Sequence, residues 1–277
     1  MSETLPLDID HARQTMADWP VGHTLLYTPR VASTMIPARR ALEKPEYASG
    51  VVCVTEEQSA GKGRLARRWD APFSTGLLST TVLKAPNLPS LLGLAPMLAG
   101  VAVTEAIAEL APELRTRLAL KWPNDVLITG EVGAEKVAGI LAESSLRAQT
   151  LTGVLLGIGI NVNQTVEQLP EPSAGMLAPT SVCLATGRTI DRTALLIALC
   201  HHLGAWLTDA CTGGSALFVR WRTLLHTLGQ DVIVSQPDGT RVAAGVAIDV
   251  LPDGSLVIEQ ADGVQTTIAA GDVTLRQ

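Results

Sequence analysis

The sequence predicts an α+β domain followed by a small all-β module. Three observations support this prediction. Runs of Val, Ile and Leu have the alternation of β-strands, and apolar residues at helical spacing lie between these runs. After Leu228 the pattern changes to short strands separated by turns that contain Asp-Gly. We therefore expect two units, one over residues 1–227 and one over residues 228–277.

The larger unit contains both strand and helix patterns. Strands are expected near residues 23–28, 50–57, 76–84, 117–121, 136–144 and 152–161. Helices are expected from a cap at Ser33 or Thr34 to Leu42, over Leu88 to Leu110, over Asp191 to Thr208 and over Ser215 to Leu228. The stretch from Pro170 to Pro179 has the composition of an exposed loop.

The smaller unit is expected to hold four short strands. They cover residues 231–235, 242–250, 255–259 and 264–268. The turns between them are Pro237-Asp-Gly, Pro252-Asp-Gly and Asp262-Gly.

Composition excludes several classes of protein. The chain has 277 residues, of which 47% are hydrophobic and 17% charged, as in compact soluble proteins. Its net charge of -6 argues against a surface that wraps nucleic acid, which needs a dominant basic face. The apolar run from Leu91 to Val103 is interrupted and too short to span a membrane, so a buried helix is expected. With no signal-peptide pattern at the start, the expected compartment is the cytoplasm.

The four cysteines do not indicate a metal or disulfide framework. Cys53, Cys183, Cys200 and Cys211 form no Cys-x-x-Cys pair and have no histidines at metal-ligand spacing. We expect reduced thiols.

A basic, glycine-bearing segment follows the strand at 50–57. It runs from Gln58 to Trp69 and contains Lys62, Arg64, Arg67 and Arg68. In an acidic protein this concentration of cations predicts a local site for a phosphate or carboxylate, although a solvated basic loop is the alternative.

The same segment contains Gly61-x-Gly63-x-x-Ala66, a formal match to the dinucleotide-binding fingerprint. Its context disfavours an oxidoreductase, because Asp70 to Gly76 is a turn into a strand and no helix begins there to receive a pyrophosphate. A Walker-type phosphate loop is excluded as well, since no Gly-Lys is followed by Ser or Thr.

Two further segments suggest a ligand site. In Leu120-Lys-Trp-Pro-Asn-Asp-Val126 a strand ends at Lys121, whose amine either reaches solvent over apolar surface or faces an anion in a cleft. The strands with Gly139, Gly157 and Gly159 carry glycines that weaken a strand unless something approaches closely.

Together these segments resemble the biotin protein ligase family. The family pattern has Ser-Thr-Asn, a glycine/arginine loop ending in Trp, Lys-Trp-Pro-Asn-Asp, Lys-x-Ala-Gly-Ile-Leu-x-Glu and Gly-x-Gly-x-Asn. All five blocks occur here in this order between residues 23 and 275, the first as Ser33-Thr34-Met35. The resemblance implies a mixed β-sheet flanked by helices, the biotin/lipoate ligase catalytic fold, and a carboxyl-terminal β-barrel like that of Src-homology-3 domains.

The resemblance also implies residue roles. The biotin-binding residues would be Ser33, Thr34, Met35, Gln58, Lys62, Gly63, Arg64, Lys121 and Gly139. The ATP-binding residues would be Arg64, Arg67, Trp69, Asn124, Lys136 and Asn161. Lys121 and Arg64 would be catalytic, with Mg²⁺ as the metal ion and its ligands unassigned.

The implied reaction explains these residue types. A biotin carboxylate must attack the α-phosphorus of ATP, so two anions meet, and Arg64, Lys121 and a magnesium ion would offset their repulsion. The loop at 58–69 would close over the biotinyl-adenylate and exclude water before transfer to a lysine of a biotin carboxyl carrier protein. No convincing general base for the transfer is found, and Asp125 is a weak candidate.

The chain departs from the family pattern at three positions. Met35 replaces an Asn, Lys62 replaces an Arg, and Ala66 replaces a Gly, so biotin affinity and loop closure are expected to be altered. Two alternatives therefore stay open, a lipoate ligase and a non-catalytic biotin-binding or regulatory protein. About 20 residues precede the resemblance, which is short for a helix-turn-helix module, so operator binding is not expected. A homodimer is left open.

Overall fold

The computed structural model describes residues 5–84, 91–131, 133–148, 150–172, 175–236 and 239–275. Residues 88–90 of the expected second helix, and Pro237 and Asp238 of the first expected turn, lie outside these ranges.

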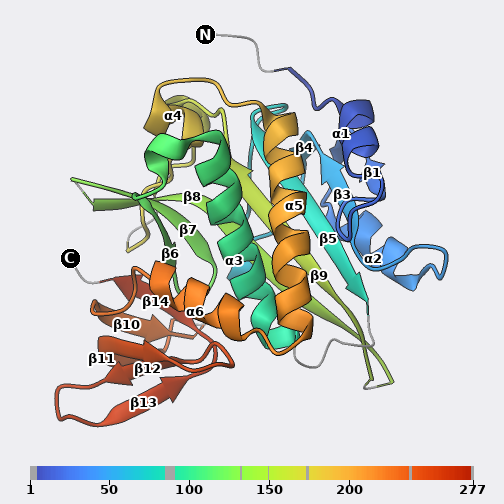
Figure 1. Cartoon of the computed structure of the whole chain (residues 1–277). Helices are drawn as coiled ribbons and strands as arrows, with labels where there is room; N and C mark the ends of the chain where they lie inside the picture. Colours follow the sequence, from blue (N-terminus) through green and yellow to red (C-terminus); the bar gives the residue numbers. More distant parts are fainter. Residues whose placement is uncertain are drawn as a thin grey trace.

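A seven-stranded sheet forms the centre of the larger unit (Figure 1). Its strands are β1 (Leu25–Tyr27), β3 (Val51–Thr55), β5 (Gly76–Lys84), β9 (Thr150–Asn161), β8 (Gly133–Arg147), β7 (Asp125–Gly130) and β6 (Leu118–Lys121), in spatial order. β1 and β3 are parallel and the other neighbours are antiparallel. The sheet is therefore mixed, as the resemblance implied.

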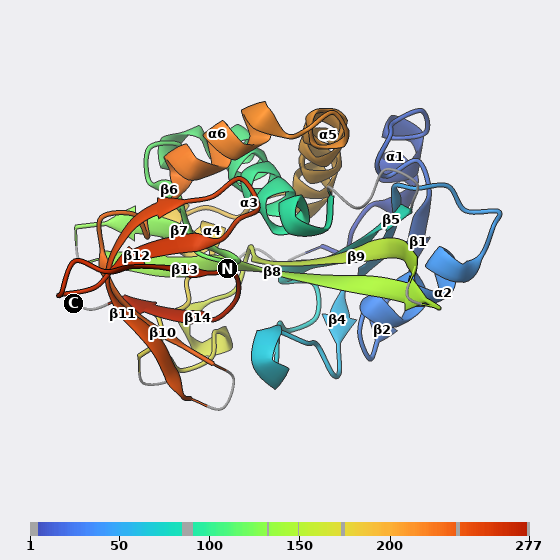
Figure 2. The same ribbon diagram turned by 90° about the horizontal axis from the view of Figure 1, so that it is seen from below.

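Helices cover mainly one face of this sheet (Figure 2). The helices are α1 (Ile9–Thr15), α2 (Met35–Glu43), α3 (Leu91–Leu110), α4 (Val182–Thr186), α5 (Arg192–Cys211) and α6 (Ser215–Leu224), with the short 3-10 helices η1 (Arg64–Ala66), η2 (Pro112–Leu114) and η3 (Val166–Gln168). Figure 2 shows α1, α3, α5 and α6 on one side of the sheet, and η1 with the short strand pair β2 (Arg30–Val31) and β4 (Glu57–Gln58) on the other.

The main hydrophobic core lies between the sheet and α3 and α5. On β9, Ile158 and Ile160 point into this core, whereas Gly157 and Gly159 alternate onto the opposite face. A second, smaller core packs α2 against β3 and β5. On the sheet face opposite α3, α2 covers one end, and η1 with the β2–β4 pair also lies on this side.

α3 and α5 have the length and apolar composition of membrane-spanning helices, but core helices of soluble proteins often have them too. Both are long and apolar enough to span a bilayer. The apolar window of α3 is 72% buried and that of α5 is 44% buried within the fold. α3 is thus the buried helix that the interrupted apolar run predicted.

The smaller unit is a five-stranded antiparallel sheet, consistent with a small barrel. Its spatial order is β13 (Gln265–Ile268), β12 (Leu256–Glu259), β11 (Arg241–Val250), β10 (Asp231–Ser235) and β14 (Asp272–Leu275). The first four strands match the prediction, but β14 was missed. Its four residues carry little local pattern, and they become a strand by pairing with β10.

Several local predictions need correction. α1 and α4 were not predicted, and both are short. The last large helix ends at Leu224 rather than Leu228, because Leu225 takes an extended conformation, pairs with Leu120, and is followed by a hydrogen bond from the His226 amide to the Leu120 carbonyl. Tertiary pairing thus ends a helix whose apolar pattern continues.

A buried ion pair supports the base of the glycine-bearing loop. The Glu56 carboxylate, fully buried between β3 and β4, lies 2.7 Å from Arg192 Nη1. Glu56 also accepts hydrogen bonds from the Leu7 amide and the Ser74 hydroxyl, and Arg192 donates to the Gly76 and Leu5 carbonyls. These bonds satisfy both charges and fix the point where the chain leaves β3 toward Gln58.

The cysteines give a direct test of the fold. Cys53 and Cys200 are buried, and burial raises the pKa of each thiol to about 12. Cys211 is exposed. Because thiolates are the reactive form, iodoacetamide at pH 8 is expected to label Cys211 in the native protein while Cys53 and Cys200 react only after denaturation. Peptide mass spectrometry of native and unfolded samples checks this, and rapid native labelling of Cys53 would contradict the packing.

Candidate functional site

A cavity of about 400 Å³ lies on the sheet face opposite α3 and α5. Its floor comes from β5, β7, β8 and β9, and its walls come from the start of α2, the loop 62–70 and residues of the segment 170–179. Asp272 of β14 completes the wall, so both units contribute to the cavity. This volume lies within the range of small-molecule sites.

The glycines of β8 and β9 let two side chains lie directly on the sheet. Gly139 and Gly159 are register partners, and a Cβ atom on them would lie 2.8 Å and 2.5 Å from the Trp69 ring. A Cβ on Gly157 would lie 2.8 Å from the Met35 methyl group. These are the close approaches that the strand glycines predicted.

Trp69 has an unused hydrogen-bond donor in the cavity wall. Its indole Nε1 is buried and has no partner within the described residues. A buried N–H without a partner is unfavourable, so a ligand that offers an acceptor beside the ring gains a bond already prepared for it.

One end of the cavity carries uncharged polar groups. The Thr34 amide donates to Gln58 Oε1 over 2.8 Å, and the Thr34 and Thr80 hydroxyl oxygens are 2.7 Å apart. Thr34 stands at the N-cap position of α2, as one of the two predicted caps, but its side chain makes no capping hydrogen bond. With its oxygen engaged by Thr34, Gln58 presents its amide nitrogen as the group that can donate to a ligand.

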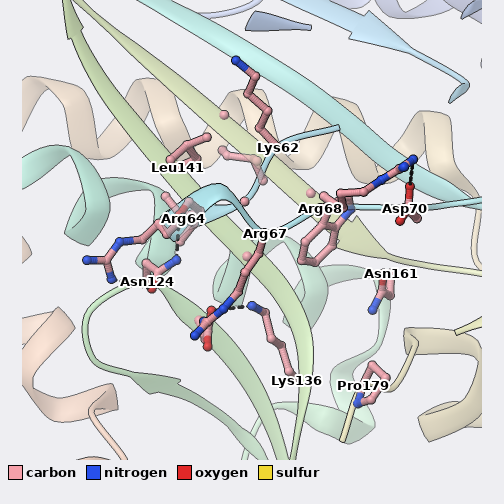
Figure 3. A pocket seen from close by; sticks show the side chains of 18 of the residues that line it. Lys62, Arg64, Arg67, Arg68, Asp70, Asn124, Lys136, Leu141, Asn161 and Pro179 are labelled. Atoms are coloured by element: carbon pink, nitrogen blue, oxygen red, sulfur yellow. Dashed lines mark hydrogen bonds and ion pairs between the residues drawn. The ribbon is translucent and has the colours of Figure 1, made fainter. Parts of the chain in front are cut away.

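The opposite end concentrates charge from separate parts of the chain. Asp125 lies 2.7 Å from Lys136 Nζ and 3.8 Å from Lys121 Nζ, and Arg67 pairs with Asp272. Arg64 donates to Asn124 Oδ1 over 3.1 Å and to the Gly271 carbonyl over 3.2 Å. Figure 3 shows the side chains of Arg64, Arg67, Asn124 and Lys136 gathered on one side of the cavity.

Burial shapes the electrostatics of this cluster. Removal from water lowers the pKa of Lys121, and the nearby carboxylates of Asp125 and Asp272 only partly offset this. Burial likewise lowers the pKa of Arg64. Burial alone would raise the pKa of Asp272, but the hydrogen bond and charge of Arg67 outweigh it, so that pKa is lowered. Four cations here face two carboxylates, which leaves positive charge for an anionic ligand.

The basic loop is folded back over the cavity. The Trp69 amide donates to the Gly61 carbonyl, and the Gly63 amide donates to the Arg67 carbonyl. A Cβ on Gly61 would lie 2.1 Å from the Trp69 carbonyl oxygen, so this crossing requires glycine. Leu65, with φ of 56°, is a positive-φ residue of this turn. The Arg64 and Arg67 contacts attach the loop to the carboxyl-terminal sheet.

Most predicted site residues line this cavity. Those lining it are Ser33, Thr34, Met35, Gln58, Lys62, Gly63, Arg64, Arg67, Trp69, Asn124, Lys136, Gly139 and Asn161. Lys121 does not line it and is buried behind Asp125. The Lys62 side chain is exposed and points away from Arg64, Arg67 and Lys136 in Figure 3. Asn161 donates to the Thr180 carbonyl over 3.0 Å and so anchors the following segment.

Several residues that line the cavity were not among the predicted binding residues, among them Thr80 and Asp125 of the sheet, and two of the missed contributors come from outside the sheet. Asp272 belongs to the unpredicted strand β14, and nothing in its local sequence signals a site. The segment 170–179 was expected to be an exposed loop, and its described residues are mostly exposed, but it also lines the cavity. The Lys136 amide donates to the Ala178 carbonyl, which holds this segment along β8.

Comparison with known proteins is consistent with this geometry. Residues 27–161 match the biotin/lipoate A/B protein ligase family, and residues 227–276 match the biotin protein ligase carboxyl-terminal domain. The biotin–acetyl-CoA-carboxylase ligase of Mycobacterium tuberculosis is 33% identical over 225 residues, covering 81% of this chain and 78% of the relative. That of Paracoccus denitrificans is 31% identical over 228 residues, covering 82% and 91%.

A solved structure gives the same result. The biotin protein ligase of Aquifex aeolicus in complex with biotin and ATP superposes with a TM-score of 0.71 at 26% identity, covering 92% of this chain and 99% of that one. Two family matches in separate parts of the chain, relatives above 30% identity and a shared fold over nearly the whole chain all agree. The chain belongs to the biotin protein ligase family.

Proposed function

We propose that this enzyme condenses biotin with ATP to biotinyl-5'-adenylate and transfers the biotinyl group to one lysine of a biotin carboxyl carrier protein domain. The single observation that carries the proposal is the cavity itself. It joins an uncharged polar end at Thr34 and Gln58 to a cationic end at Arg64, Arg67 and Lys136. The biotin carboxylate and an ATP phosphate are both anions, so they are proposed to meet at the cationic end.

The proposed placement of biotin follows from this polarity. The uncharged ureido ring of biotin suits the Thr34, Gln58 and Thr80 groups, which can donate and accept hydrogen bonds without charge. Its aliphatic chain then runs over Gly157 beside Met35, toward Arg64. Met35 occupies the position of the family's Asn, so it supplies apolar contact there instead of a hydrogen bond.

The nucleotide is proposed to lie at the other end. Trp69, which packs against Gly139 and Gly159, offers its ring face to the adenine, and its N–H, which has no partner within the described residues, can donate to an acceptor beside the ring. Arg64, Arg67 and Lys136 would hold the phosphates, with Asn124 orienting Arg64 and Asn161 positioning the neighbouring segment.

Charge explains the chemistry of the first step. The biotin carboxylate oxygen attacks the α-phosphorus, a carbon–oxygen–phosphorus anhydride forms, and pyrophosphate leaves with the bonding electron pair. Two unit charges about 4 Å apart repel by ~4 kcal/mol at an effective dielectric near 20. The cations at Arg64, Lys121 and Lys136 are fixed before the substrates arrive, so they offset this repulsion without reorganising.

A magnesium ion carried by ATP is proposed to bind at the cationic end, where two carboxylates that now pair with cations would exchange those partners for the ion. Magnesium prefers carboxylate, phosphate and water oxygens and is commonly bound by one or two protein carboxylates. Asp125 and Asp272 both line the cationic end and would hold the ion. When bound, it adds charge neutralisation at the phosphates.

The loop 62–70 is proposed to keep the mixed anhydride from water. It already folds over the cavity and is tied to the carboxyl-terminal sheet by Arg64 and Arg67. Release of the Arg67–Asp272 pair would let substrates enter. In the second step the uncharged amine of the carrier lysine attacks the acyl carbon, AMP leaves, and the amine proton passes to solvent or to the departing phosphate.

The decisive experiment measures both half-reactions. Purified protein with ATP, magnesium and biotin is expected to release pyrophosphate, and subsequent addition of a biotin carboxyl carrier domain is expected to yield a biotinylated lysine by mass spectrometry. Absence of pyrophosphate release would overturn the proposed catalysis, and biotin binding measured by titration in that case would favour a non-catalytic biotin-binding protein. Lipoate offered in a parallel reaction tests the related alternative, and preferential transfer of lipoate would overturn the biotin assignment.

The strand glycines provide a matched pair of variants. Gly159→Ala would place a Cβ 2.5 Å from the rigid Trp69 ring, whereas Gly157→Ala would meet the flexible end of Met35 at 2.8 Å. We therefore expect Gly159→Ala to raise the KM for ATP by at least about tenfold, equivalent to ~1.4 kcal/mol. Gly157→Ala should change the KM for ATP much less, because a methionine methyl group can rotate away. Equal effects on ATP would remove Trp69 from the nucleotide site.

The remaining assignments are proposed together. We propose a boundary between units at residues 227 and 228, supported by the Leu225 pairing and by the strand that begins at Asp231. A carboxylase carrier in the cytoplasm, where ATP is available, is the proposed partner. Association of two copies stays a prediction that analytical ultracentrifugation tests.

A further inference from the structure

A cluster of histidines and carboxylates lies in the helical layer, away from the ligase cavity. It is formed by Glu105 and Glu109 of α3 and by His201 and His202 of α5. Ligand atoms of Glu109, His201 and His202 all lie within 4.8 Å of one another. Figure 2 places α3 and α5 on the sheet face opposite the basic loop, so this cluster is separate from the proposed biotin and ATP sites.

We propose that Glu109, His201 and His202 form a binding site for a divalent transition-metal ion, of the class of Zn²⁺, that bridges α3 and α5. Two imidazoles and one carboxylate are a donor set typical of zinc, which prefers nitrogen and carboxylate ligands and leaves a fourth position to water. Magnesium, which prefers oxygen ligands, is not the ion that this set selects.

The distances are close to those of a metal site. His202 Nε2 lies 2.9 Å from Glu109 Oε2. In a tetrahedral zinc site with bonds of about 2.0–2.2 Å, two ligand atoms lie roughly 3.3–3.5 Å apart, so the His202–Glu109 pair must open by a few tenths of an ångström. The three ligand atoms lie within 4.8 Å of one another, so the exposed His201 ring closes the remaining distance when the ion binds. The ion would replace the proton now shared by Nε2 and the carboxylate, and that proton would leave to solvent.

A second carboxylate holds the His202 ring in the orientation that a metal ligand needs. Glu105 Oε2 lies 3.4 Å from His202 Nδ1, the ring nitrogen opposite the proposed ligand atom. Histidines that bind metals usually donate their other N–H to a carboxylate, which fixes the tautomer.

Glu105 is itself held by neighbouring donors. It accepts from Trp206 Nε1 over 2.7 Å and from Arg220 Nε over 3.1 Å. A carboxylate with this many partners is already in place before any ion binds. The His202 ring is therefore held by a network that exists before any ion binds, whereas Glu109 and His201 are exposed and can adjust to it.

The third ligand is positioned by aromatic contacts. The His201 ring lies 5.2 Å from the His202 ring and 5.5 Å from Trp19, measured between centroids. These contacts keep His201 beside His202, although adjacent helix positions project about 100° apart. Since α3 and α5 each supply a ligand, a bound ion would link the two helices and stabilise the native state.

The test uses untagged full-length protein, first freed of metals with a chelator. Titration with Co²⁺ is expected to give one equivalent of binding, with visible absorption of a four- or five-coordinate ion, and Zn²⁺ should displace it. Zn²⁺ is also expected to raise the Tm. His201→Ala and Glu109→Gln should each weaken Zn²⁺ binding at least tenfold, and Glu105→Gln should weaken it by about 10–100-fold through the ring orientation.

The controls separate this site from other histidines and from misfolding. His11→Ala, a histidine outside the cluster, should bind Zn²⁺ like the parent protein. Circular dichroism and the metal-free Tm establish that each variant folds. Absence of stoichiometric Co²⁺ binding, or unchanged binding in folded His201→Ala and Glu109→Gln, would overturn the proposal. Pyrophosphate release with biotin and ATP is expected to continue in these variants, because none of them touches the ligase cavity.

Discussion

Replacing Lys121 by alanine is expected to reduce biotinyl-adenylate formation by about 10²–10³-fold or more, the loss typical of a group that stabilises transition-state charge. Lys121 is buried at the end of β6, and its amine lies 3.8 Å from Asp125 at the cationic end of the cavity. A water molecule that entered the space left by the Lys121 side chain would not supply its positive charge. Pyrophosphate release under saturating ATP and biotin measures the effect.

The fold is expected to survive this substitution. Asp125 keeps Lys136 at 2.7 Å, so removal of Lys121 does not leave a buried carboxylate unpaired. Lys121→Met, which retains most of the side-chain stem, should lose activity equally while packing better. Lys84→Ala is the matched control, since Lys84 also ends a strand but donates to the Lys44 and Tyr47 carbonyls. Adenylate formation unchanged in folded Lys121→Ala would refute the catalytic assignment.

The pH dependence of kcat/KM is expected to reflect the titration of Lys121. Burial lowers the pKa of Lys121 below its ordinary value of 10.5, so kcat/KM is expected to fall with rising pH earlier than for an exposed lysine. This fall in kcat/KM would not come from unfolding of the protein when Lys121 loses its proton. The unfolded chain holds more protons between the lowered and ordinary pKa values, so this group makes stability rise with pH across that window.

Replacing Arg64 by alanine is expected to have a comparable effect, with about a 10²–10³-fold loss in adenylate formation. The substitution removes a cation and two attachments of the loop, the bonds to Asn124 and to the Gly271 carbonyl. The loop would therefore lose both charge stabilisation and its hold on the carboxyl-terminal sheet. Hydrolysis of preformed biotinyl-adenylate should accelerate as well, which high-performance liquid chromatography can follow.

Arg68→Ala tests whether position or total charge matters. Arg68 lies on the same loop, but it pairs with Asp70 and is mostly exposed. Its loss should change the rate by less than about tenfold, because exposed pairs contribute little. Arg64→Lys keeps the charge but cannot make both hydrogen bonds in a fixed fork, so an intermediate rate is expected. Equal losses for Arg64→Ala and Arg68→Ala would mean that the loop acts only through its overall charge.

Local sequence pattern predicted most of the fold because strand and helix periods are local properties. The alternation at 76–84 and 152–161 corresponds to β5 and β9, and Asp191 caps α5 as its residue type indicates. The pattern failed where long-range pairing decides. β14 is a strand because β10 is beside it, and α6 ends early because Leu225 pairs with Leu120.

The candidate site was predicted in its chemistry and only partly in its geometry. The residue types of the loop 58–69 and of Lys121-Trp-Pro-Asn-Asp already indicated an anion site. Their sequence did not indicate that Lys121 lies behind Asp125, that Lys62 points away, or that Asp272 completes the wall. These placements depend on strand order and on how the two units pack, which no local window contains.

By itself the sequence determined the order of the elements, the concentration of cations in an acidic chain and the motifs shared with biotin protein ligases. Only the tertiary structure decided which groups meet. The β8–β9 register sets Gly139 beside Gly159 under Trp69, and the packing of α3 against α5 brings Glu109 to His202. The physical reason is range: backbone periodicity acts over a few residues, whereas a site requires contacts between segments that are distant in the chain.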